Sequence, residues 1–132
     1  MKRLIVCLGL LGLLVSPAMA ISEFGKQWKS EYLGEGANED FVKLGRKAGC
    51  NVCHVKDEKK EEARNEYGKA VNEFLKKEDF PKDYVKENPE EAKKKIIEGF
   101  KKAGEKKSAD KRTFAEKIKN NELPAVDAKL DD

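Results

Sequence analysis

Residues 50–54 read Cys50-Asn51-Val52-Cys53-His54, and the rest of the chain is interpreted around this stretch. The pattern C-x-x-C-H is typical of covalent haem attachment. Two thiols separated by two residues can add to the two vinyl groups of one porphyrin, and a histidine directly after them can reach the iron from the same side. The stretch therefore predicts one covalently bound haem c. Its cofactor-binding residues would be Cys50, Cys53 and His54, with His54 as the iron ligand.

Two other chemistries use closely spaced cysteines, and chance occurrence is a third alternative. A thioredoxin-like redox pair needs a strand-helix-strand setting, and this chain has no strand-like alternation. A closed zinc site needs four ligands, usually two Cys or His pairs, so a carboxylate would have to complete the set. The haem is favoured because the chain reads as helical and exported, and because every Cys and His after residue 20 lies within this stretch.

The first twenty residues differ in composition from the rest. Lys2 and Arg3 precede an apolar run over residues 4–15, and residues 18–20 read Ala-Met-Ala, a small-residue cleavage signal. The run is too short for a membrane span of about 20 residues. We expect residues 1–20 to be a cleaved secretory signal peptide, with an uncleaved anchor as the alternative. Residues 21–132 would then form one domain, exported to the periplasm or an equivalent compartment without a stable membrane anchor, which is where haem c is attached.

The composition argues against several classes of function. Without Lys2 and Arg3, 26 basic residues face 25 acidic ones, and this net charge of +1 gives a nucleic-acid role no electrostatic support. Hydrophobic residues make up 39% of the chain and charged residues 40%, so the core is small unless an apolar cofactor enlarges it. No second cluster of Cys or His and no distinctive carboxylate pair is found, so we do not expect an enzyme.

Apolar spacing and capping residues predict an all-α fold of about four to five short helices. The predicted helices cover residues 22–33, residues 38–49, a segment from about 63, residues 88–104 and a short segment from 113. Asn38, Asn88 and Thr113 are expected to cap three of them. The polar tail to Asp132 is expected to fray.

Within these helices, apolar side chains at three- and four-residue spacing are expected to face the core. These positions include Phe24, Trp28, Tyr32, Phe41, Leu44, Ala48, Tyr67, Phe74, Ile96 and Phe100. Gly68 interrupts the third helix at a cost of about 1 kcal/mol relative to alanine. Such a glycine indicates the close approach of another helix or of the haem plane.

Four stretches of the chain form a set: Cys50-Asn51-Val52-Cys53-His54-Val55, Arg64-Asn65-Glu66-Tyr67-Gly68-Lys69-Ala70, Lys94-Lys95-Ile96-Ile97 and Thr113-Phe114. In these stretches the chain resembles small mono-haem c-type cytochromes, and particularly exported cytochrome-like proteins of planctomycete-type bacteria. The resemblance implies a small cytochrome c-like domain packed around one haem. It also implies thioether bonds at Cys50 and Cys53, with His54 as the proximal iron ligand.

The chain departs from ordinary class I cytochromes c on the distal side of the iron, where those proteins use a methionine. Neither a methionine nor a second histidine follows position 20. The distal position would be open, or filled by water, a lysine, Tyr67, Tyr84, the amine of Ile21 or a group from a partner chain. The axial ligand sets potential and reactivity, so this departure bears directly on function.

Two functions fit these observations. The first is electron transfer with redox protein partners, at a lower potential than that of a His/Met cytochrome, because thioether ligation raises the potential. The second is binding of NO or CO, with Phe74, Ile96, Phe100 and Phe114 as pocket-lining candidates, although each is more simply a core residue. A third arrangement combines the two: the chain would be one subunit of a hetero-oligomeric cytochrome, with a second cytochrome subunit shaping the distal site.

Overall fold

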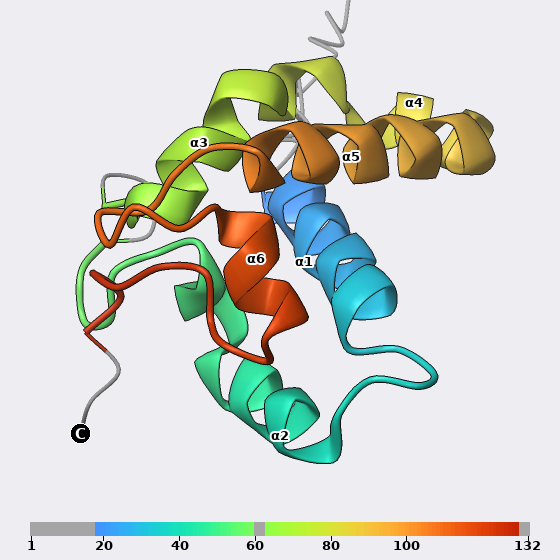
Figure 1. The fold of residues 1–132 in the computed structure, drawn as a ribbon. Coiled ribbons are helices and arrows are strands. Elements are labelled where there is room, and N and C mark those ends of the chain that lie inside the picture. Colours follow the sequence, from blue (N-terminus) through green and yellow to red (C-terminus); the bar gives the residue numbers. More distant parts are fainter. Residues whose placement is uncertain (1–17, 60–62, 130–132) are drawn as a thin grey trace, which may run out of the picture.

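A computed structural model describes residues 18–59 and 63–129, and these residues fold into six α-helices (Figure 1). The helices are α1 (Ala18–Tyr32), α2 (Glu39–Ala48), α3 (Glu66–Phe74), α4 (Lys82–Glu87), α5 (Pro89–Gly104) and α6 (Phe114–Lys119). Two short 3-10 helices, η1 (Gly49–Val52) and η2 (Lys77–Asp79), complete the secondary structure, and no strand forms in the described residues. The all-α prediction is confirmed. The helix count rises to six because α4 was not among the predicted helices.

Helix α5 is the element on which the other helices pack. It contacts α1, α3, α4 and α6, and Figure 1 shows α1 and α6 lying beneath it. The side chains buried between these helices include Trp28, Tyr67, Ile96, Phe100 and Phe114, as their spacing predicted. The core is therefore built mainly from four helices and their aromatic side chains, and α2, at the lower edge of Figure 1, adds Phe41 and Ala48 to it.

Two predicted core positions are wrong, because they lie on the surface. Leu44 is 40% exposed, since the inward position on α2 is taken by Gly45. A Cβ atom on Gly45 would lie 2.7 Å from Cδ1 of Leu33, so α2 packs on Leu33 through bare backbone. Phe74 is 37% exposed at the end of α3, and the ammonium of Lys106 lies 5.6 Å from its ring centroid.

The helix starts follow local capping chemistry, with two corrections. Asn38 accepts hydrogen bonds from the backbone of α2, and Thr113 forms a capping box with Glu116. The third helix begins at Glu66 and not near residue 63, because Asn65 is its N-cap. Asn88 does not cap α5 through its side chain, which instead donates to the carbonyl of Tyr84 at 3.3 Å.

The C-terminal segment does not fray over the residues that the structure describes, contrary to expectation. Pro124 and Ala128 are buried, and the backbone N–H of Lys56 donates to the carbonyl of Ala128 at 3.0 Å. The last three residues lie outside the described part, as do residues 1–17 of the predicted signal peptide. Among the described helices, none combines the length and apolar character needed to cross a membrane.

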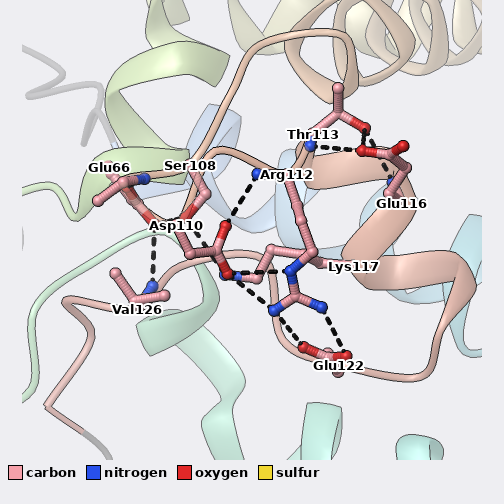
Figure 2. A network of polar contacts seen from close by, with 10 residues as sticks. Glu66, Ser108, Asp110, Arg112, Thr113, Glu116, Lys117, Glu122 and Val126 are labelled. Atoms are coloured by element: carbon pink, nitrogen blue, oxygen red, sulfur yellow. Dashed lines mark hydrogen bonds and ion pairs between the residues drawn. The ribbon is translucent and has the colours of Figure 1, made fainter.

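A polar network holds this segment in place (Figure 2). The carboxylate of Glu66 accepts hydrogen bonds from Ser108 and from the backbone N–H groups of Ala109, at 2.8 Å, and Val126, at 3.0 Å. The ammonium of Lys117, only 2% exposed, donates to the Ser108 hydroxyl at 3.3 Å. Burial alone would raise the pKa of Glu66, but the bonds from Ser108, Val126 and Ala109 outweigh it and lower the pKa.

Candidate functional site

The predicted haem motif forms one tight turn at the end of α2, which we call the motif turn (Gly49–His54). Gly49 leaves the helix at a φ of +53°, a conformation that favours glycine. The backbone N–H groups of Cys53 and His54 both donate to the carbonyl of Cys50, at 3.3 and 3.2 Å. The 3-10 helix η1 ends at Val52, and Cys53 is its C-cap.

Asn65 joins the motif turn to α3 and is completely buried. Its Nδ2 atom donates to the carbonyl of Val52 at 2.9 Å, of Asn51 at 3.0 Å and of His54 at 3.3 Å. Its Oδ1 atom accepts from the backbone N–H of Gly68 at 2.8 Å. One side chain therefore caps α3 and satisfies backbone acceptors on both sides of Cys53.

Gly68 explains how α3 comes so close to the motif turn. A Cβ atom at this position would lie 1.9 Å from the carbonyl oxygen of Cys53, inside any allowed contact. That same carbonyl accepts the backbone N–H of Asn65 at 3.0 Å. A close approach at Gly68 is therefore confirmed, but the approaching group is the backbone of the motif and not another helix or the haem plane.

The two thiols occupy different environments. Cys50 is exposed, whereas Cys53 is partly buried against the hydrophobic core, and neither forms a disulfide. Burial raises the pKa of Cys53 to about 12, with a further increase from Cys50 and a smaller decrease from Arg64. Such a thiol carries almost no thiolate near neutral pH, and the thiolate is the form that attacks disulfides and binds metals.

The described residues lack the structural settings of the two alternative uses of the motif. A zinc site needs converging ligands, and within the described ranges no three or more His, Cys, Asp or Glu side chains are placed to hold a metal ion. The thioredoxin-like setting is also missing from these ranges, because they contain only isolated bridges and no strand.

His54 follows Cys53 at the point where the motif turn meets the chain leading into α3. It forms an isolated antiparallel bridge with Arg64, and the next residue, Val55, donates its backbone N–H to the carbonyl of Ala63 at 3.1 Å. The residue as a whole is partly buried, and its Nδ1 atom is buried. The backbone on both sides of the imidazole is therefore fixed by bonds to the chain before α3.

The tyrosines that were candidate distal ligands lie in different surroundings. Tyr67 is completely buried beside Cys53, and its hydroxyl accepts the indole N–H of Trp28 at 3.0 Å. Burial, and then the nearby Cys53, raise its pKa well above 10, so it is a neutral phenol. The hydroxyl of Tyr84 instead bonds Lys95, at 2.9 Å, and Glu91, at 3.2 Å, on α5.

Three of the four apolar residues considered as a gas pocket are core residues, as the simpler interpretation predicted, and Phe74 is not. Ile96, Phe100 and Phe114 are at most 1% exposed, whereas Phe74 lies at the surface. Two hollows, of about 460 and 390 Å³, lie along α5. Neither is lined by the cysteines or the histidine of the motif turn.

The motif turn carries the groups that a covalently held porphyrin takes from a chain. One of its two thiols lies at the surface and the other against apolar side chains, and the imidazole follows immediately. A porphyrin needs these two attachment points and one axial donor from the chain, and the turn supplies all three.

Asn65 and Glu66 are the residues of this region that sequence reasoning did not assign a role. The signal for Asn65 was its position directly before the helical pattern of α3, where asparagine is a preferred N-cap. The contacts that these two residues make with the motif turn and the C-terminal segment depend on the folded chain.

Compared with known family models, with curated proteins and with solved structures, the chain gives no match.

Proposed function

We propose that this protein is an exported mono-haem c-type cytochrome that transfers electrons. In each attachment step, the S–H of a cysteine adds across a vinyl group, forming a C–S bond while the hydrogen passes to the neighbouring carbon. Cys50 and Cys53 would each make one such bond, and His54 would ligate the iron as the proximal ligand. Bound in this way, the haem supplies a one-electron iron couple, whose potential depends on its axial ligands.

The observation that carries the proposal is the geometry of the motif turn. The backbone N–H groups of Cys53 and His54 share the carbonyl of Cys50, so the two cysteines and the histidine belong to one tight turn. The exposure of Cys50 puts one attachment point at the molecular surface, where a redox partner protein can approach. Covalent attachment also prevents loss of the cofactor outside the cell, in keeping with the predicted signal peptide.

The experiment is to produce the full chain in a host with a cytochrome c maturation system and measure covalent haem by mass spectrometry and absorption. We expect one haem per chain, and C50S or C53S should each remove one thioether bond. C7S is the matched control: Cys7 lies in the predicted signal peptide, so this change should leave the haem content unaltered. A mature protein without covalent haem would refute the proposal.

His54→Ala tests the axial ligand separately. We expect this variant to keep its thioether bonds and to change the ferric absorption and EPR spectra, because the proximal ligand is lost. Unchanged iron spectra would contradict the assignment of His54.

A second candidate function, binding of NO or CO, is favoured by one observation. No methionine or second histidine follows position 20, so the chain lacks the common strong distal ligands. A high-spin ferric spectrum, with a ferrous form that shifts on adding CO, would favour gas binding. A low-spin spectrum insensitive to CO would argue against gas binding and favour electron transfer. Measuring the oligomeric state of the same sample tests whether a second cytochrome subunit contributes to the distal site.

A further inference from the structure

The hydrogen bonds of the Asn65 side chain hold its amide in one orientation, with the oxygen towards α3 and the NH₂ group towards the motif turn. Its Oδ1 atom accepts the N–H of Gly68, so its NH₂ group must face the carbonyls of Asn51, Val52 and His54. The opposite orientation would bring the amide oxygen against three carbonyl oxygens and the NH₂ group against an N–H donor. The chain therefore fixes both the position and the orientation of this buried group.

We propose that Asn65 is the positioning residue of the motif turn: it sets the direction in which the two thiols and the imidazole of His54 point. This inference deepens the proposed function and rests on it. Drawing the carbonyls of Asn51 and Val52 towards the buried amide holds the turn in one conformation. The bond to the carbonyl of His54 fixes the backbone from which the imidazole projects.

The position of Asn65 makes this role more than a helix cap. Its backbone N–H also donates to the carbonyl of Cys53 at 3.0 Å, so backbone and side chain together bond four consecutive residues, 51–54. Groups that orient the first ligands of a metal tune its properties, and here the ligand is the proximal histidine. The role of Asn65 thus predicts an effect on the iron as well as on stability.

The test compares Asn65→Ser with Asn38→Ser. Serine is as good an N-cap as asparagine, so both variants keep a helix cap. At position 38 nothing else is lost, because the side chain of Asn38 caps only Asp40 and Phe41. At position 65 the shorter hydroxyl cannot reach the three carbonyls. If Asn65→Ser fails to fold, Asn65→Thr serves instead, with Asn38→Thr as its control, since threonine keeps a capping hydroxyl and more of the side-chain volume but has no NH₂ donor.

The first measurement is hydrogen–deuterium exchange of the purified protein, read at the amides of Cys53 and His54. We expect Asn65→Ser to speed exchange there roughly tenfold or more, as for a local opening that loses about one buried hydrogen bond. Asn38→Ser should leave these amides at the wild-type rate. Equal exchange in both variants would overturn the proposal, whether or not the protein carries haem.

The second measurement uses the haem-loaded protein. Asn65→Ser should shift the ferric EPR g values and the reduction potential, whereas Asn38→Ser should leave both unchanged. Unaltered spectra and potential in Asn65→Ser would overturn the positioning role even if exchange increases. A wild-type protein without covalent haem would instead refute the proposed function, and the exchange experiment would still decide whether Asn65 holds the turn.

Discussion

Gly68→Ala is the sharpest test of how α3 meets the motif turn. On helix propensity alone, alanine should stabilise α3 by about 1 kcal/mol. The structure predicts the opposite, because the added Cβ would lie 1.9 Å from the oxygen and 2.8 Å from the carbon of the Cys53 carbonyl. Both are backbone atoms, and restoring an ordinary contact would require a shift of about 1.5 Å in a close-packed region.

The expected cost can be bounded from these contacts. Overpacking typically costs about 1–3 kcal/mol, and here the displaced carbonyl also accepts the N–H of Asn65. Weakening that hydrogen bond costs about 1 kcal/mol more, which roughly cancels the propensity gain, so we expect a net loss of about 1–3 kcal/mol in the free energy of unfolding. Gly25→Ala is the matched control, since a Cβ at that exposed position in α1 meets nothing within 4 Å. It should gain about 0.5–1 kcal/mol.

The assay is urea unfolding of the wild type and both variants, followed by circular dichroism at 222 nm. The two glycine substitutions should move the midpoint in opposite directions, with little change in the slope against urea. In the haem-loaded protein, Gly68→Ala should also alter the ferric spectrum, because it displaces Cys53. A Gly68→Ala variant as stable as Gly25→Ala would refute the close approach of α3 to the motif turn.

Two further predictions concern the polar network and the packing of α2. Because the pKa of Glu66 is lower in the folded than in the unfolded chain, its carboxylate contributes stability above the unfolded value of about 4.5 that is lost as the pH falls through the lowered pKa. Glu66→Gln should therefore weaken the pH dependence of urea midpoints between pH 6 and pH 3, and an unchanged dependence would contradict this role. On α2, Phe41→Ala should cost about 3–5 kcal/mol and Leu44→Ala at most about 0.5 kcal/mol, because Phe41 is buried and Leu44 is exposed. Equal losses in urea unfolding would show that the two faces of α2 are wrongly assigned.

The C-terminal segment is hydrogen-bonded to residues that lie close in sequence to the motif turn and to Asn65. Its Ala128 accepts the N–H of Lys56, two residues after His54, and its Val126 bonds Glu66, the residue after Asn65. The C-terminal segment therefore bonds the chain just after the motif turn, at Lys56, and the first residue of α3, Glu66.

Much of this protein follows from short-range sequence information. The C-x-x-C-H spacing, the capping at Asn38 and Thr113 and the apolar periodicity each involve residues a few positions apart. Local chemistry of this kind is nearly independent of the rest of the chain, so it predicted the helical class, most of the core and the residues of the candidate site. The signal-peptide pattern is also of this kind, and it is the basis for expecting export.

Other features were decided only by tertiary structure. Periodicity identifies an apolar stripe but not the neighbour that covers it, so Leu44 and Phe74 read as core although they lie at the surface. The glycine at position 68 indicated a close approach, but the sequence did not show that the approaching group is the carbonyl of Cys53. Asn65 was assigned no role from the sequence, yet it caps α3 and its amide reaches carbonyls 11 to 14 residues away. Sequence by itself placed two thiols and an imidazole together in the chain. The folded chain decided which groups hold them, because those contacts join segments that only packing brings together.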